Sequence, residues 1–131
     1  MKAIFKPGDK KQYRRIIEPA DEASFHNETV HHVYATFSLA RDAEWTTRQF
    51  VLEMKDEDED GIGTFLSVEH KSPAFIGEEV IFTAWVDHID GNELTCFFEA
   101  RVDSRLIAMG RTGQKILRKE KLERIFQRSE D

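Results

Sequence analysis

The spacing of hydrophobic residues changes near the middle of the chain, from a period of three to four residues to a period of two. Between residue 37 and about residue 54, apolar or small residues recur at the helical period and predict one long helix with a buried stripe. The predicted stripe consists of Phe37, Ala40, Ala43, Thr47, Phe50, Val51 and Met54. No other segment keeps this period over such a length, so we expect this helix to be the central one.

Strands are predicted after the helix, because apolar and polar residues then alternate. The alternating segments are residues 63–70, 79–88, 93–102 and 106–117. Asp90-Gly91 lies between the second and third segments and is typical of a tight hairpin. Asp103-Ser104 provides another short connection before the last segment.

The two ends of the chain complete the predicted domain. Residues 1–34 form its N-terminal part, with a strand at 10–17 and then an irregular approach to the helix. Residues 119–131 are expected to be a short C-terminal helix or tail. We therefore predict one α+β domain over residues 1–131, in which a curved antiparallel sheet wraps around the long central helix. The four strands after the helix are expected to form a meander.

Composition and charge exclude several classes of partner. A chain of 131 residues with 40% hydrophobic residues suits one compact domain. The formal net charge of −6 opposes binding to nucleic acid, and no segment offers the roughly 20 apolar residues that span a bilayer. Cys96 is the only cysteine, so it cannot form an internal disulfide, and its strand position predicts a buried thiol. We expect a soluble, cytoplasmic protein that binds neither nucleic acid nor membrane.

Three polar residues have positions that suggest chemistry. His70 ends the predicted strand at 63–70 on the face that carries its apolar residues, so the imidazole is expected to point toward the core. Glu44 lies near the predicted helical stripe, and the alternative to a functional role is a surface ion pair with Arg48, one turn further on. Thr36 precedes the helix and by itself is most simply its N-cap.

These residues and their neighbours match a spaced pattern on the helix and the first strand after it. The pattern comprises Thr36, Glu44, Gly63, Thr64, His70 and Gly77. In sequence it reads ATFSLARDAE, then GTFLSVEHKSPAFIG. The pattern resembles hot-dog-fold acyl-CoA thioesterases of the fluoroacetyl-CoA thioesterase type, and the likeness extends from about residue 34 to residue 126. It implies a hot-dog fold and a homodimer with active sites at the subunit interface.

The resemblance also implies an activity, the hydrolysis of an acyl-CoA thioester to a free acid and coenzyme A. The implied catalytic residues are Thr36, Glu44 and His70, and the coenzyme A thioester is the substrate, with no further cofactor. Glu44 would attack the thioester or activate water, and His70 would move the proton. Thr36 would hydrogen-bond the carboxylate or the substrate carbonyl.

Substrate binding is expected from the neighbouring positions of the same pattern. The implied binding residues are Gly63, Thr64 and Gly77, with the Gly63 N–H as a donor to the carbonyl oxygen. Lys71 or Arg111 could supply the positive charge that an anionic coenzyme requires.

The chain departs from the family pattern in two segments. The residues before Thr36 read HNETVHHVY and lack the phenylalanines of the family's lid. The last strand reads Thr112-Gly113-Gln114, where many relatives have a more polar sequence. Selectivity for fluoroacetyl-CoA is therefore not implied.

The spacing of Thr36 and Glu44 raises a geometric question. Eight residues of continuous helix separate them by about 12 Å, which one acyl group cannot easily bridge. Either Thr36 lies in a bent approach before the helix, or each site takes its threonine and its glutamate from different subunits.

Other functions remain as alternatives. The same fold can serve as a non-catalytic module that binds acyl-CoA or a small ligand, or that dimerises. A hot-dog hydratase usually carries Asp and His together on the helix, and residues 41–45 do not show this pair. A metal site would have to use His26, His31 and His32, two of which are adjacent and point in different directions. Residues 56–61 resemble the start of a calcium loop, but the twelfth position is a serine, so the match fails.

Overall fold

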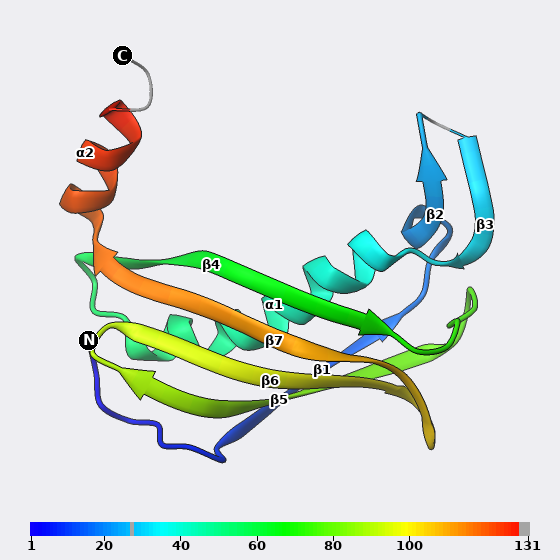
Figure 1. Ribbon diagram of the computed structural model, residues 1–131, viewed down its shortest axis with the longest axis horizontal. Helices are drawn as coiled ribbons and strands as arrows, with labels where there is room; N and C mark the ends of the chain where they lie inside the picture. Colours follow the sequence, from blue (N-terminus) through cyan, green and yellow to red (C-terminus); the bar gives the residue numbers. More distant parts are fainter. Residues whose placement is uncertain (27, 129–131) are drawn as a thin grey trace.

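A long helix lying against one face of an antiparallel sheet forms the centre of the protein (Figure 1). The computed structural model describes residues 1–26 and 28–128. The central helix is α1 (Thr36–Met54). The sheet consists of β1 (Lys10–Ile16), β4 (Glu59–His70), β5 (Glu79–Asp90), β6 (Glu93–Val102) and β7 (Arg105–Arg118). The predicted α+β architecture, with a helix wrapped by an antiparallel sheet, is confirmed.

The order of the strands differs from the predicted meander. The strands pair in the order β1-β5-β6-β7-β4, so only β5, β6 and β7 are consecutive neighbours. β4 pairs with β7 instead of β5 and lies at one edge of the sheet, while β1 occupies the other edge. Alternation identifies strands but carries no information about their neighbours. As a result, one side of β4 has no strand beside it in the described chain.

Residues 20–34 contain regular structure, so the predicted irregular approach is wrong. A short 3-10 helix, η1 (Pro19–Asp21), leads into β2 (Glu22–Phe25) and β3 (Glu28–Tyr34), which form a separate hairpin. Most side chains of β3 are exposed, so the sequence lacks the alternation that marks a half-buried strand. The hairpin projects past β4 at one end of the sheet (Figure 1).

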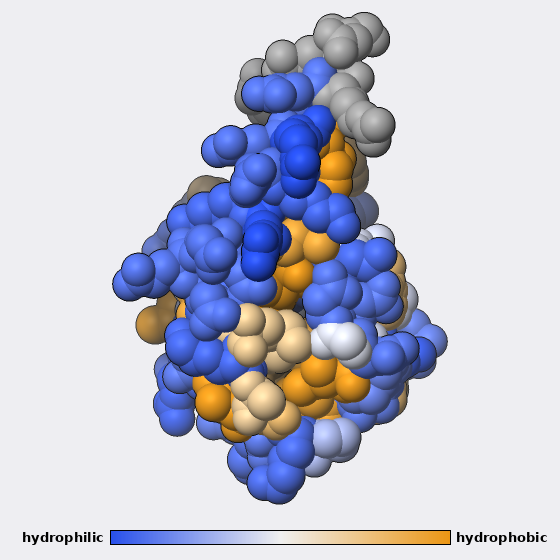
Figure 2. Space-filling view, turned by 90° about the vertical axis from the view of Figure 1, so that its left-hand side faces the viewer, coloured by the Kyte–Doolittle hydropathy of each residue, from blue (hydrophilic) through white to orange (hydrophobic). Residues whose placement is uncertain are grey.

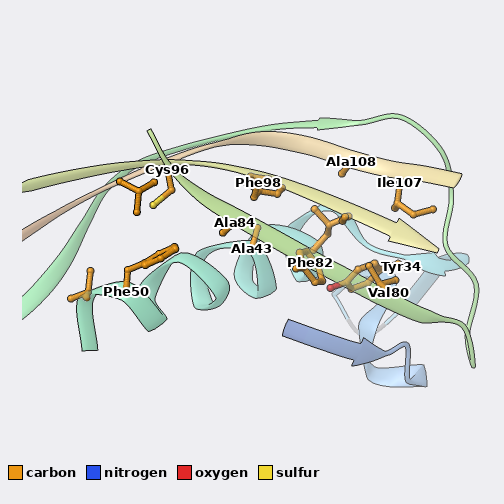
Figure 3. Close-up of a cluster of buried hydrophobic side chains, with 14 of the residues drawn as sticks. Tyr34, Ala43, Phe50, Val80, Phe82, Ala84, Cys96, Phe98, Ile107 and Ala108 are labelled. Atoms are coloured by element: carbon orange, nitrogen blue, oxygen red, sulfur yellow. The ribbon is translucent and has the colours of Figure 1, made fainter. Parts of the chain in front are cut away.

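The core lies between α1 and the inner face of the sheet (Figure 3). The predicted stripe is correct in the C-terminal half of α1, where Phe50, Val51 and Met54 are buried. It is wrong at the start, because Phe37 is 51% exposed and Leu39 is buried in its place. Cys96 is buried as predicted, and burial raises the pKa of its thiol to about 12.

The C-terminal helix α2 (Lys119–Arg128) was predicted and is confirmed. It projects from the end of the sheet opposite the β2–β3 hairpin (Figure 1). Within the described ranges, neither α1 nor α2 is long and apolar enough to cross a membrane.

Two adjacent phenylalanines on β6 test this view of the core. Phe98 is 1% exposed on the inner face, and Phe97 is 44% exposed on the outer face. We expect Phe98→Ala to lower the free energy of unfolding by about 3–5 kcal/mol, because it leaves a cavity. Phe97→Ala, the matched control, is expected to cost less than about 1 kcal/mol. Urea denaturation measures both, and equal losses would contradict the assignment of the two faces.

Candidate active site

A cavity of about 310 Å³ lies where the hairpin, the start of α1 and the end of β4 meet. Its walls contain apolar side chains, two histidines and one lysine. The lining residues are Ala23, His31, Val33, Tyr34, Thr36, His70, Lys71, Ser72 and Pro73. Two of the three predicted catalytic residues, Thr36 and His70, therefore face one cavity.

Thr36 and His70 are joined by a hydrogen bond between Oγ1 of the threonine and Nδ1 of the imidazole, 3.0 Å apart. Thr36 is the first residue of α1, whereas Ala35 is the N-cap and makes no side-chain capping bond. The predicted capping role of Thr36 is therefore wrong. Its hydroxyl group contacts His70 because β4 ends beside the first turn of the helix.

His70 points toward the interior, as its strand position predicts, and is partly buried. Burial lowers the pKa of its imidazole, and the nearby backbone of Ser72 opposes this shift only in part. Nε2 is shielded from solvent and has no hydrogen-bond partner of acceptable geometry in the described chain. Nδ1 is thus the ring nitrogen that contacts another residue of the cavity wall, Thr36.

Glu44 lies against a different part of β4. A Cβ atom added to Gly63 would come within 2.2 Å of Oε1 of Glu44, so the carboxylate occupies space that only a glycine leaves free. Thr64 is an extra residue in the pairing of β4 with β7, and this bulge turns Gly63 toward the helix. Arg48 binds Asp60 instead of Glu44, at 3.1 Å, so the predicted surface pair is wrong.

Within one protomer, the structure separates Glu44 from the other two residues. α1 is continuous from Thr36, so the alternative of a bent approach is wrong, and about 12 Å of helix separates Thr36 from Glu44. Along β4, seven residues separate Gly63 from His70, a distance of about 23 Å. A protomer thus holds a Thr36–His70 pair at the end of β4 and a glutamate near the middle of the same strand.

The two predicted cations lie in different places. Lys71 lines the cavity beside His70, and its ammonium group pairs with Glu69 at 2.7 Å. Arg111 pairs with Asp87 at 2.8 Å and stacks on the ring of Phe97, which belongs to the outer face. The structure therefore brings Lys71, but not Arg111, to the Thr36–His70 pair.

Gly77, which was predicted to bind substrate, has a structural role. Gly77 has φ +90°, a conformation that favours glycine, and its N–H donates to the carbonyl of Ile17 at 2.8 Å. This N–H is consequently occupied within the fold. Gly63 and Thr64 lie together on β4 beside Glu44, about 23 Å from the cavity end of the strand.

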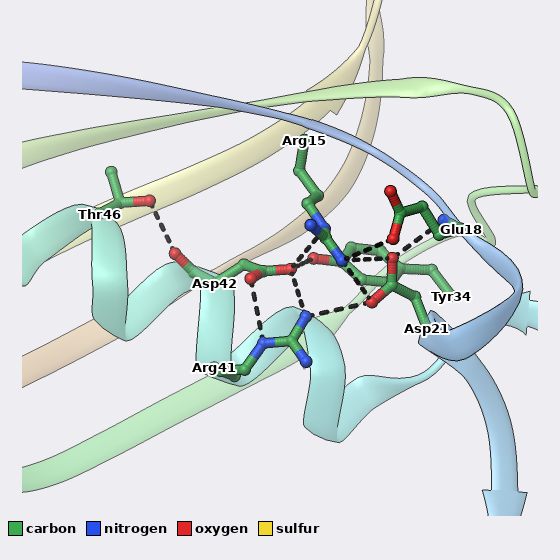
Figure 4. A network of polar contacts seen from close by, with 7 residues as sticks. All are labelled: Arg15, Glu18, Asp21, Tyr34, Arg41, Asp42 and Thr46. Atoms are coloured by element: carbon green, nitrogen blue, oxygen red, sulfur yellow. Dashed lines mark hydrogen bonds and ion pairs between the residues drawn. The ribbon is translucent and has the colours of Figure 1, made fainter.

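A buried polar network next to the cavity was not predicted (Figure 4). Asp21 is 1% exposed and accepts hydrogen bonds from Arg15 at 2.9 Å and Arg41 at 3.1 Å. Asp42 is 4% exposed, pairs with Arg41 at 3.2 Å and accepts a hydrogen bond from the hydroxyl group of Tyr34. The predicted stripe gave no signal for the burial of Asp42, because it omits Leu39, which lies one turn earlier on the buried side of α1.

The network shifts the pKa values of its members. Burial alone would raise the pKa of Asp21, but hydrogen bonds from Arg15, the Glu18 backbone and Arg41 outweigh it and lower that pKa. Burial and the hydrogen bond to Asp42 raise the pKa of Tyr34, so the phenol stays protonated and donates. The network ties η1 and the end of β3 to the first turns of α1, and thus positions Thr36.

No group of three histidine, cysteine or acidic side chains that could hold a metal ion occurs in residues 1–26 and 28–128. His32 instead contacts Glu22 across the hairpin at 3.2 Å.

Comparison with known proteins agrees with this fold. The model of the fluoroacetyl-CoA-specific thioesterase (FlK) family matches residues 17–120. A Thermus thermophilus hypothetical protein, described as a thioesterase superfamily member, is 31% identical with a TM-score of 0.93, covering 99% of this chain and 96% of that one. A mutant of FlK is 19% identical, with a TM-score of 0.88 and coverage of 98% and 99%.

A further solved structure carries the name of the fold. A hot-dog-like protein from Thermanaerovibrio acidaminovorans is 19% identical, with a TM-score of 0.86 and coverage of 95% and 93%. The predicted hot-dog fold and the resemblance to the fluoroacetyl-CoA thioesterase type are thereby confirmed. No curated protein matches the chain.

The buried network generates a prediction about stability in acid. The pKa of Asp21 in the folded state lies below its ordinary value of 3.8, so its ionised form stabilises the fold above pH 3.8. This contribution is lost as the pH falls through the lowered pKa. We expect Asp21→Asn to cost about 1–3 kcal/mol near pH 7 and progressively less below pH 4. Urea denaturation at several pH values measures this.

The matched control is Asp103→Asn in the exposed β6–β7 turn, which should leave the stability nearly unchanged at every pH. A cost of Asp21→Asn that does not shrink in acid would contradict the stabilising role of the ionised Asp21.

Proposed function

The chain belongs to the fluoroacetyl-CoA-specific thioesterase family, and we propose that it hydrolyses an acyl-CoA thioester to a free acid and coenzyme A in sites shared by two subunits. The observation that carries the proposal is the placement of the Thr36–His70 pair and of Glu44 along one strand, β4. Neither the Thr36–His70 pair nor Glu44 alone provides all the functional groups that thioester hydrolysis needs. Together they supply a carboxylate, a proton carrier and a hydroxyl group.

The free edge of β4 supports a homodimer. This strand has 12 residues and pairs with β7 on one side only, so the N–H and C=O groups of its other side are available for a second chain. Phe65, in the middle of the strand, is 48% exposed. Two copies related by a two-fold axis would pair their β4 strands antiparallel and extend the sheet across both subunits.

Such pairing can unite the separated groups. A two-fold axis at Ser67, with Thr64 again left as an extra residue, sets Gly63 of one subunit opposite His70 of the other. Residues directly opposite each other in an antiparallel pair lie about 5 Å apart and point to the same face. Glu44, packed on Gly63, would then reach the Thr36–His70 pair of the second subunit, on the helix side of the sheet.

The roles of the residues follow from this arrangement. Glu44 either attacks the thioester carbonyl to form a mixed anhydride and expel the thiolate, or removes a proton from the attacking water. His70 exchanges the proton at Nδ1, since Nε2 is shielded. The Thr36 hydroxyl, bonded to the same nitrogen, orients the ring and can donate to the substrate.

The cavity suggests how the substrate lies. Ala23, Val33 and Pro73 give it an apolar wall that suits an acyl group, and Lys71 at the end of β4 places positive charge near the bound coenzyme. A mutant of FlK has been crystallised in complex with fluoroacetate and coenzyme A. The proposed substrate is an acyl-CoA thioester without selectivity for fluoroacetyl-CoA, because the segment before Thr36 lacks the lid phenylalanines of the family.

Release of free thiol from acyl-CoA thioesters tests the activity. We expect Glu44→Gln and His70→Ala each to lower kcat/KM by about 10²–10⁴-fold, because each removes one partner of the proton transfer. Circular dichroism verifies that both variants are folded. A wild-type protein that binds acyl-CoA without releasing thiol would instead support the non-catalytic module.

Mixing the two inactive variants tests whether the site is shared. In a mixed dimer, one site combines the intact Glu44 of one chain with the intact His70 of the other, and the second site lacks both. Co-expression in equal amounts should therefore restore about a quarter of the wild-type activity. The control pairs Glu44→Gln with the double variant, which offers no intact Glu44. If the mixture stays as inactive as this control, the shared site is wrong.

The pH dependence of the reaction provides another test. His70 must be neutral to accept a proton, and burial lowers its pKa below the ordinary value of 6.5. We expect kcat/KM to stay high below pH 6.5 and to fall only as the pH drops through the lowered pKa. His31→Gln, which changes the other histidine of the cavity, should leave this midpoint in place. An acid limb centred above pH 6.5 would contradict the assignment of His70 as the base.

A further inference from the structure

The C-terminal helix α2 carries an apolar stripe that runs past the body of the protein. Leu122 is 6% exposed and packs on the body, whereas Ile125 and Phe126, three and four residues on, are 42% and 53% exposed. This spacing puts all three side chains on one helical face. In Figure 2 hydrophobic residues lie along one side of the projecting helix, next to hydrophilic residues on the face in view.

A helix of this length needs a packing surface. α2 has ten residues, and an isolated helix of that size is only marginally stable in water. In its first turn, the Lys119 N–H donates to the carbonyl of Asp58 at 2.8 Å, and Leu122 is buried. The match to the family model ends at residue 120, so the stripe lies outside it.

The position of α2 relative to β4 indicates which surface of a second subunit would contact its apolar stripe. α2 follows Arg118, which pairs with Glu59 at the beginning of β4, and rises from that end of the sheet (Figure 1). The cavity is lined by His70, at the end of β4. Antiparallel pairing of two β4 strands brings the beginning of each strand next to the end of the other. Each α2 would then lie beside the cavity of the partner subunit.

The cavity end of the protomer has matching surface. Three of its large apolar side chains are strongly exposed: Phe25 on the hairpin at 60%, and Phe75 and Ile76 in the β4–β5 connection at 47% and 40%. Acidic Glu22 and Glu28 lie on the same hairpin as Phe25, whereas Arg105 lies over the ring of Phe75. α2 carries more basic than acidic side chains, so its charge complements the acidic residues of the hairpin.

We propose that α2 of each subunit packs its Ile125–Phe126 face on the cavity end of the second copy and closes one side of that cavity. This interaction rests on the two-subunit site proposed above. It gives the β2–β3 hairpin, which supplies Ala23, His31 and Val33 to the cavity, a support from the other chain.

Cysteine cross-linking tests the contact. Ile125→Cys is combined with Ile76→Cys in one variant and with Phe25→Cys in another, and each is treated with a short bismaleimide. Within one chain, the length of β4, roughly 35 Å, separates the two ends, so a short linker can only join different chains. We expect a covalent dimer from at least one variant. The native Cys96 is buried and should not react.

A matched control combines Ile125→Cys with Gln12→Cys on β1, the opposite edge of the sheet, and should give no covalent dimer. Sedimentation and thiol release are measured on the same samples. A dimer that hydrolyses thioester without cross-linking at either position overturns the α2 contact and leaves the shared site intact. A monomer by sedimentation overturns both. Cross-linking of the control as fast as the test variants also overturns the contact.

Discussion

The burial of two carboxylates, Asp42 on the central helix and Asp21 at the end of η1, constrains the rest of the structure. A buried aspartate is tolerated only where donors and opposite charge surround it, and Asp42 and Asp21 find these in Tyr34, Arg15 and Arg41. The partners come from separate segments of the chain. Their convergence ties the first turns of α1 to β1, η1 and the end of β3.

From this constraint follows the placement of the candidate catalytic residues. With α1 held in one rotation, its first residue, Thr36, meets the end of β4 at His70, and Glu44, two turns on, meets Gly63. The bulge at Thr64 matters here, because without it Gly63 would face away from the helix. Thr36 and Glu44 are about 12 Å apart along α1, whereas the β4 residues that they contact, His70 and Gly63, are about 23 Å apart. One protomer therefore cannot bring Glu44 to the Thr36–His70 pair.

The edge position of β4 links chemistry to assembly. Because the chain returns after β4 to form β5, β6 and β7 as a meander, β4 joins the sheet beside β7 and keeps one side free. The hairpin and α2 project at opposite ends of this same edge (Figure 1). The two ends of this edge therefore differ. A partner related by a two-fold axis would place its α2 end beside the hairpin end of the first subunit.

Local periodicity was sufficient to predict α1, the strands β5 to β7 and the inward direction of His70, because each depends only on residues close in sequence. The spacing of Thr36, Glu44 and His70 was also readable, and it indicated the family. The hairpin at 22–34, the burial of Asp42 and Leu39, and the pairing of Arg48 with Asp60 were not readable. Nor were the bulge at Thr64 and the place of β4 at the edge. These features arise from contacts between segments far apart in the chain, and a periodic pattern records which face of an element is buried without recording what buries it.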